Sequence, residues 1–176
     1  IQQSCMEHDD DIRWLIALIS DTGMRLAEAA GLHVKDIKLD EDIPYVDIKP
    51  HPWRSLKTKG SQRQVPLVGA SLWAAQRIRA NKSSCFEFPR YTDNSRCNAN
   101  SATNALNKWI QANFRDDIVM HGFRHAMRNR LRAVSCPSEI IDQIGGWSSG
   151  KVGDGYGEGY SVLQTAQWMT RLSLTL

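Results

Sequence analysis

Apolar residues recur every three or four positions in several stretches of this chain. Between residues 8 and 20 these positions follow an acidic run, a pattern that predicts an amphipathic helix. Thr22-Gly23 should end this helix, and Gly31 should end a short second helix that contains Arg25. The spacing predicts the following helices after the first: residues 25–30, 70–80, 99–113, 121–134, 137–144 and 162–174.

The helix predicted over residues 121–134 carries one apolar face. Phe123, Met127 and Leu131 recur at a spacing of four and should point toward the core. The basic side chains between them should be more exposed, and these are Arg124, Arg128, Arg130 and Arg132.

A different pattern begins near Ile37. Short runs of β-branched and apolar residues between turn-rich segments predict three strands, near residues 37–39, 45–48 and 64–66. We therefore expect an α+β fold that is mainly α-helical, with a small antiparallel β-sheet of about three strands. Residues 81–98 are polar and give no periodic signal.

The composition indicates a globular chain. With 176 residues and 41% hydrophobic content it is long enough to bury a core as one domain. No run of about 18 apolar residues and no signal peptide is present, so we expect a cytoplasmic protein without a membrane partner. The four cysteines lack metal-site spacing and should be free thiols.

The formal charge of +3 is unevenly distributed. Residues 1–50 hold 5 Lys/Arg against 11 Asp/Glu, whereas residues 51–134 hold 15 against 4 and residues 135–176 hold 2 against 4. A basic segment of this kind is typical of a partner that is a polyanion. A solvated charged face is the other explanation of such a run.

Several residue types in this chain suit phosphate chemistry. Arg25 and Arg124 could form a clamp, because a guanidinium grips phosphate oxygens in a planar, bidentate way. Nearby cations would favour the anion of a tyrosine hydroxyl and so activate it as a nucleophile. Lysine and histidine can move protons in such a reaction.

These residues fall in segments that resemble the tyrosine recombinases, also called phage integrases, over almost the whole chain. Residues 22–32 look like the first box of the family, with the catalytic arginine at Arg25 and a supporting acidic residue at Glu28. Residues 57–67 are similar to the β-hairpin that supplies the catalytic lysine. Lys57 fits the common Lys-Thr pattern better, and Lys59 remains an alternative.

The second half of the chain continues the resemblance. His121, Arg124 and His125 match the second box. The family usually has Leu-Gly-His before its nucleophile, and this chain departs from that pattern with Gly-Gly-Trp147, although some members use tryptophan there. Tyr156 lies nine residues beyond Trp147, the interval usual in the family, whereas Tyr160 lies thirteen beyond.

The resemblance implies a mechanism without metal or cofactor. Tyr156 would attack a DNA phosphate to give a 3′-phosphotyrosyl link, with charge on the phosphate stabilised by Arg25, Arg124 and Trp147. Lys57 would protonate the leaving 5′ oxygen and His121 would assist proton movement at the tyrosine. The two other positions would have supporting roles, at Glu28 and His125.

The resemblance also implies partners and a setting. We expect residues 1–176 to be the catalytic domain alone, because the chain has no room for the N-terminal core-binding domain of the family. The start at Ile1 rather than Met suggests a fragment or a processed product. It would act on double-stranded DNA attachment sites as a homo-tetramer and be a monomer in isolation. The predicted helix over 162–174 would pack on its own domain or on a neighbouring protomer. We expect an integrase of a prophage or genomic island, cytoplasmic and associated with the bacterial nucleoid.

Three other functions fit the same residues, and one of them is a structural or regulatory remnant that would neither bind DNA nor form a covalent link to it. A type IB topoisomerase uses a similar set of side chains to relax supercoiled DNA. A non-catalytic DNA-binding module would keep the basic segment without forming a covalent link.

Overall fold

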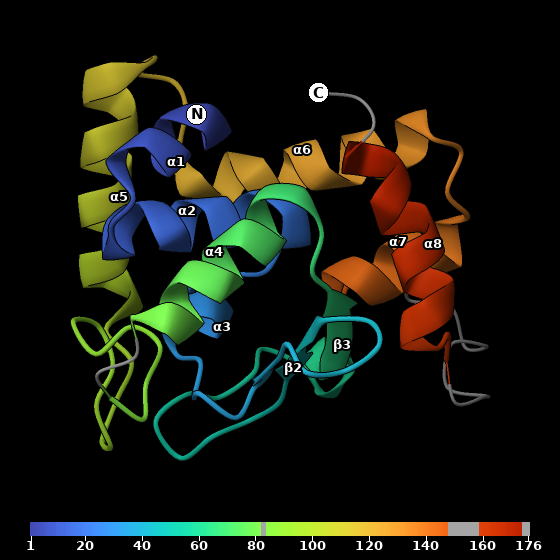
Figure 1. Ribbon diagram of the computed structural model, residues 1–176, viewed down its shortest axis with the longest axis horizontal. Helices are drawn as coiled ribbons and strands as arrows, with labels where there is room; N and C mark the ends of the chain where they lie inside the picture. The colour runs from blue at the N-terminus through green and yellow to red at the C-terminus, as the bar shows by residue number, and fades with distance from the viewer. Residues whose placement is uncertain (82–83, 148–158, 174–176) are drawn as a thin grey trace.

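The computed structural model describes residues 1–81, 84–147 and 159–173. The small sheet lies at one side of the helices (Figure 1). The helices are α1 (Gln2–His8), α2 (Asp11–Thr22), α3 (Leu26–Ala30), α4 (Gly69–Ala80), α5 (Ala99–Asn113), α6 (Met120–Ala133), α7 (Ser138–Gly145) and α8 (Val162–Ser173). Within the described ranges, no helix is both long and apolar enough to cross a membrane.

The start of the chain corrects one prediction. The helix predicted behind the acidic run is present as α2 but begins at Asp11, and a separate helix that was not predicted, α1, ends at His8, where Asp9 takes a left-handed conformation. Asp10 then caps α2 by accepting a hydrogen bond from the backbone nitrogen of Arg13 at 3.1 Å. The acidic run is therefore a turn and a cap between two helices.

The sheet has the order β1-β2-β3 and is antiparallel, as predicted. Its strands are β1 (Ile37–Lys38), β2 (Tyr45–Ile48) and β3 (Arg63–Pro66). Val46 pairs with Ile37 on one side and with Val65 on the other, and the two valines and the isoleucine are buried. A short 3-10 helix, η1 (Lys59–Ser61), lies in the long connection between β2 and β3.

The core lies between α2 and the elements packed on it, which include α1, α4 and α6. Leu15, Ile16, Leu18 and Ile19 of α2 are at most 1% exposed, so this helix is buried on more than one face. Helix α2 is therefore the central helix of the core, and α1, α4 and α6 pack around it.

Helix α8 packs on its own domain in this structure. Met169 and Leu172 are buried and the helix contacts β3 and α6, whereas Leu163 is 57% exposed. All four cysteines are free thiols, as predicted.

Candidate active site

Arg25 lies between α2 and the first turn of α3. It is the cap residue of α3 and not, as predicted, part of the first turn. Its backbone nitrogen donates to Glu28 Oε2 at 2.9 Å and its Nη1 donates to Glu28 Oε1 at 2.7 Å. Nη1 also donates to Ser61 Oγ at 3.1 Å, and Nη2 donates to the backbone oxygen of Gly146 at 3.1 Å. The guanidinium thus joins three segments that are far apart in sequence.

Glu28 is buried at the centre of this network. Besides Arg25, the carboxylate accepts from Arg63 Nη2 at 2.9 Å and from Arg63 Nη1 at 3.3 Å. Burial raises the pKa of the Glu28 carboxyl, but the charge of Arg63 and the hydrogen bonds from both arginines outweigh it and leave the pKa below its ordinary value. Glu28 is therefore an anion held between two cations.

Arg124 is buried in α6, with 4% exposure. The prediction that it is among the more exposed arginines of this helix is wrong. Its Nη1 donates to the backbone oxygen of Gly23 at 2.7 Å, which draws the side chain between α6 and the end of α2. Its Nη2 is also buried and has no hydrogen-bond partner among the described residues. Burial, and then the charges of Arg25 and Arg63, lower the pKa of Arg124 to about 10.

Trp147 covers the guanidinium of Arg124. The ring centroid lies 4.4 Å from Arg124 Cζ and 5.0 Å from Arg128 Cζ, both within cation–π range. The ring folds back over Gly145, where an added Cβ would lie 1.9 Å from Trp147 Cε3. The residue at 145 must therefore lack a side chain for the ring to take this position.

Arg25, Glu28, Arg124 and Trp147 thus form one site, built from α3, α6 and the end of α7. Arg63 of β3 supplies a third guanidinium, and Glu28 is the anion that contacts two of the three. The charge of each of the other two arginines lowers the pKa of Arg124. A site with this excess of fixed positive charge is suited to bind an oxyanion.

The two histidines of the second box lie on the exposed side of α6. His121 and His125 contact each other edge to face, with ring centroids 4.9 Å apart and planes at 79°. Both side chains are exposed. His121 lies one turn before Arg124 and His125 directly follows it, and both are open to solvent, where a proton donor or acceptor could reach a bound substrate.

The connection between β2 and β3 carries Lys57 and Lys59 and is called the lysine loop below. It lies beside this site. Lys57 is exposed, two residues before η1 begins at Lys59. Thr58 Oγ1 and Ser61 Oγ are 3.0 Å apart, and Ser61 Oγ accepts from Arg25, so the base of the loop is attached to the arginine network. The structure leaves the choice between Lys57 and Lys59 open.

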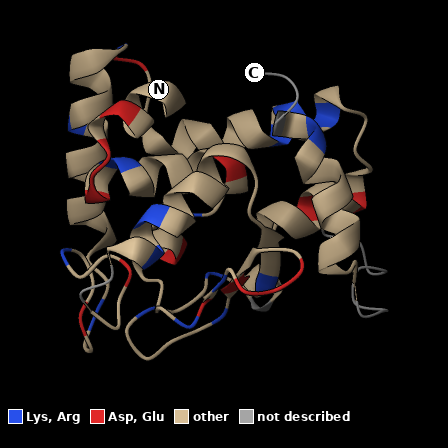
Figure 2. Cartoon of the chain, viewed as in Figure 1, with Lys and Arg blue, Asp and Glu red and all other residues tan. Residues whose placement is uncertain are grey.

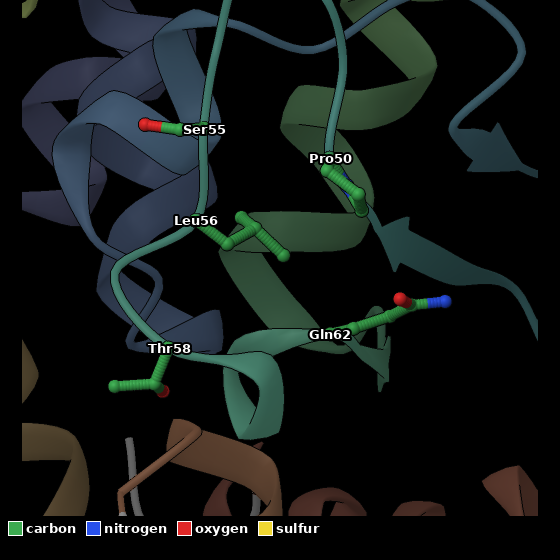
Figure 3. Close-up of a pocket in the computed structure, with 5 residues that line it drawn as sticks. All are labelled: Pro50, Ser55, Leu56, Thr58 and Gln62. Atoms are coloured by element: carbon green, nitrogen blue, oxygen red, sulfur yellow. The ribbon is translucent and has the colours of Figure 1, made fainter.

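The same loop encloses a hollow of about 540 Å³ (Figure 3). Leu56 points between Pro50 and Gln62 in this view. The five residues that line the hollow are Pro50, Ser55, Leu56, Thr58 and Gln62.

The predicted nucleophile, Tyr156, lies outside the described residues. Tyr160 is described and is half-buried. Its backbone nitrogen donates to Gln143 Oε1 at 2.7 Å and its backbone oxygen accepts from Gln143 Nε2 at 2.6 Å. Gln143 of α7 therefore fixes the chain where it leaves the segment that contains Tyr156.

Sequence reasoning assigned no role to Arg63. A signal was present, because Arg63 and Val65 share one face of a strand while Gln64 faces solvent. A charged residue at an inward position requires a buried partner, and the acidic residue of the first box supplies it.

The charge asymmetry of the sequence is partly neutralised inside the fold. Cations of the basic middle segment form ion pairs with the acidic first 50 residues, and these pairs are Arg63–Glu28, Arg77–Asp9, Arg79–Asp40, Arg90–Asp11 and Arg130–Asp21. In Figure 2 blue segments mark the C-terminal half of α6, which contains Arg128, Arg130 and Arg132. Some cations of the basic segment therefore form ion pairs with the first 50 residues, and others add positive charge to the surface.

Comparison with known proteins places the fold. No curated protein sequence matches this chain. Among solved structures, the chain is similar to the integrase of the Tn1549 transposon, described in complex with transposon right-end DNA. The TM-score is 0.54 at 18% identity, over 88% of this chain and 56% of that chain. This chain therefore spans about half the length of that integrase, and the likeness confirms the predicted fold.

A family model supplies the assignment. The model described as the phage integrase family matches residues 2–157, which include every predicted site residue. Together with the fold, this match confirms the resemblance seen in the sequence: the chain belongs to the phage integrase family and carries its tyrosine recombinase catalytic domain.

Proposed function

We propose that this chain breaks and rejoins DNA strands through a 3′-phosphotyrosyl intermediate, as in the integration and excision of a prophage or genomic island. The Tyr156 oxygen attacks the scissile phosphorus, the bond from phosphorus to the 5′ oxygen breaks, and Lys57 donates a proton to that oxygen. His121 takes up the tyrosine proton. Rejoining reverses these steps with the 5′ hydroxyl of a partner strand, so no water is consumed.

The observation that carries this proposal is the buried Nη2 of Arg124, which has no hydrogen-bond partner in the part of the chain that the structure describes and lies near the charge of Arg25. A buried donor without a partner costs about 1–3 kcal/mol, a cost that a bound anion would remove. In the proposed mechanism the anion is the scissile phosphate, with its non-bridging oxygens bound by Arg25, Arg124 and Trp147. Charge that develops there in the transition state meets donors already in place.

The remaining residues have less direct roles. Glu28 orients Arg25 through its two hydrogen bonds to that residue. His125 contacts the ring of His121 and supports its orientation. The exposed position of Lys57 agrees with a loop that meets the DNA from outside the arginine network.

The proposed partners are double-stranded DNA and, on DNA, three further copies of the chain. The Tn1549 integrase structure contains transposon-end DNA. We propose that residues 1–176 act as a catalytic domain that binds duplex DNA weakly and in a salt-dependent way. Ion pairing within the fold leaves fewer cations for phosphates than the sequence charge indicates.

Covalent trapping tests the proposal. A pool of duplexes randomised around a nick is incubated with the chain, because cleavage near the nick releases a short fragment and traps the protein on DNA. Denaturing electrophoresis should reveal an adduct with wild type and with Tyr160→Phe, and none with Tyr156→Phe. An adduct that survives in Tyr156→Phe and disappears in Tyr160→Phe would move the nucleophile to Tyr160.

Sequencing of the trapped DNA and relaxation assays separate the alternatives. Recombinase activity requires a selected sequence in the trapped pool and strand exchange between two copies of it. Relaxation of supercoiled plasmid without sequence selection would instead indicate a topoisomerase. Duplex binding with no adduct from any variant would indicate a non-catalytic DNA-binding module.

A further inference from the structure

We propose that Arg63 is a positioning residue of this site, which holds the phosphate-binding arginines in place without itself contacting DNA. The proposal rests on the proposed function, and its tests below separate the two. Arg63 lies in β3 and its side chain is 2% exposed. It lies where β3, α3 and the end of α7 meet, and it is not one of the residues that the family boxes identify.

The guanidinium of Arg63 is already occupied by protein acceptors. Nε donates to the backbone oxygen of Ile144 at 2.8 Å, and Nη1 donates to the backbone oxygen of Ser61 at 2.7 Å. Nη1 and Nη2 both reach the Glu28 carboxylate, at 3.3 and 2.9 Å. With every nitrogen bonded and the side chain buried, Arg63 has no face to offer a phosphate.

Arg63 acts on Arg25 through Glu28. Each oxygen of the Glu28 carboxylate accepts from both arginines: Oε1 from the two Nη1 groups, and Oε2 from Arg63 Nη2 and the Arg25 backbone nitrogen. The carboxylate orientation that suits Arg25 is therefore the one that Arg63 fixes. The charge of Arg63 also keeps Glu28 ionised in spite of its burial.

Arg63 acts on Trp147 through Gly146. The Gly146 backbone has φ of +59°, and an added Cβ would lie 2.7 Å from Arg63 Nη1. The oxygen of this glycine accepts from Arg25 Nη2, and the next residue is the tryptophan whose ring covers Arg124. Arg63 and Gly146 thus fit together in a way that places both phosphate-binding arginines.

A lysine at position 63 could not make the same set of hydrogen bonds as Arg63. Arg63 donates in three directions at once, toward α3, the lysine loop and the end of α7. A planar fork does this with fixed geometry, whereas an ammonium group is a point charge on a flexible stem. Arg63→Lys should keep the attraction to Glu28 and lose the bonds that fix Ile144 and Ser61.

The test compares Arg63→Met and Arg63→Lys with Arg54→Met. Arg54 is a matched control, because the whole residue is 4% exposed, against 6% for the whole of Arg63. Its guanidinium likewise donates to backbone oxygens, those of Glu28 and Lys49. For each variant the folded fraction is measured first by urea titration. Single-turnover adduct formation and duplex affinity are then measured per folded molecule with a trapped DNA sequence.

We expect the adduct rate of Arg63→Met at saturating DNA to fall by about 10- to 100-fold, the scale of a misplaced catalytic group. Duplex affinity should change less than about threefold, because Arg63 does not contact DNA. Arg63→Lys should recover part of the rate and Arg54→Met should retain nearly all of it. A wild-type rate in Arg63→Met, or an equal loss in Arg54→Met, would overturn the positioning role.

A second measurement does not depend on catalysis. Carbon-13 NMR of the Glu28 carboxyl should show a higher pKa in Arg63→Lys or Arg63→Met than in wild type. Nitrogen-15 NMR should show faster exchange of the Arg25 guanidinium protons. A wild-type chain that forms no adduct would sink the proposed function alone. An unchanged Glu28 titration together with unchanged Arg25 exchange would sink the role of Arg63 whatever the adduct assay shows.

Discussion

Arg124 Nη1 donates to the backbone oxygen of Gly23, 101 residues earlier in the chain, at 2.7 Å. This bond brings the second box of the family to the end of α2, next to the first box. The second nitrogen of the same guanidinium is left buried beside Arg25 without a partner among the described residues. One guanidinium therefore both joins the two boxes and leaves a buried hydrogen-bond donor at their junction.

Arg124→Met should separate stability from activity. The substitution removes a buried charge that faces two other arginines, and it leaves the Gly23 oxygen without its donor. These effects oppose each other, so the free energy of unfolding should change by less than about 1 kcal/mol. Adduct formation should fall by about 100-fold or more. Urea titration measures the free energy of unfolding, and covalent trapping measures adduct formation. If the free energy of unfolding fell by several kcal/mol, the charge of Arg124 would have to be stabilised by other groups of the protein before any anion binds.

Small oxyanions should stabilise the chain. Inorganic vanadate or phosphate at about ten times its dissociation constant would add about 1.4 kcal/mol. For a chain of this size that corresponds to a rise in Tm of about 3–6 °C. Differential scanning fluorimetry at matched ionic strength measures it, with sodium chloride as the control salt. The rise should vanish in Arg124→Met, and an equal rise in that variant would place the anion elsewhere.

The Glu28 carboxylate should make stability depend on acidic pH. Its pKa lies below the ordinary value of 4.5 in the folded chain, so the unfolded chain binds the proton more readily. The stabilisation is complete above pH 4.5 and is lost as the pH falls through the lower, folded pKa. Urea titrations of wild type and Glu28→Gln between pH 7 and 3 should show a gap that narrows toward pH 3. A constant gap would mean that the Glu28 carboxyl has the same pKa in the folded and the unfolded chain.

Gly146→Ala should destabilise the chain, whereas Gly122→Ala should not. Alanine at 146 would take a positive φ and meet the guanidinium of Arg63, at a cost of about 2 kcal/mol or more. An added Cβ at Gly122 of α6 has no atom within 4 Å, and alanine there should add about 0.5 kcal/mol. Unfolding free energies from urea titration measure both. Equal effects at the two positions would remove the argument for a close fit between Gly146 and Arg63.

Local patterns in the sequence predicted most of the fold. Period and turn residues were sufficient for β2 and for helices such as α5, whose bounds match the prediction at 99–113. They failed at Asp9, because three successive aspartates look like a helix start and do not show that the first of them ends another helix. They also failed for Arg124, since an apolar face predicts which residues point inward but not that a cation joins them.

The site was predicted to the extent that the family boxes name its residues. Arg25, Glu28, Arg124 and Trp147 do lie together, over separations in sequence that no local pattern connects. The alternation in its own strand indicates that Arg63 points inward, but it does not identify the partners of Arg63. Its partners lie 35 and 81 residues away, at Glu28 and Ile144, and only the folded chain brings them within hydrogen-bond distance.

Ser61 gives the lysine loop a mechanical property. Its hydroxyl lies 3.0 Å from Thr58 Oγ1 and 3.1 Å from Arg25 Nη1, so one side chain is shared by the loop that carries the lysine and by the clamp. The loop cannot swing outward from this point without taking a ligand from Arg25. Loop opening would therefore also loosen Arg25, and in the proposed mechanism a chain with its lysine withdrawn would bind the phosphate less tightly.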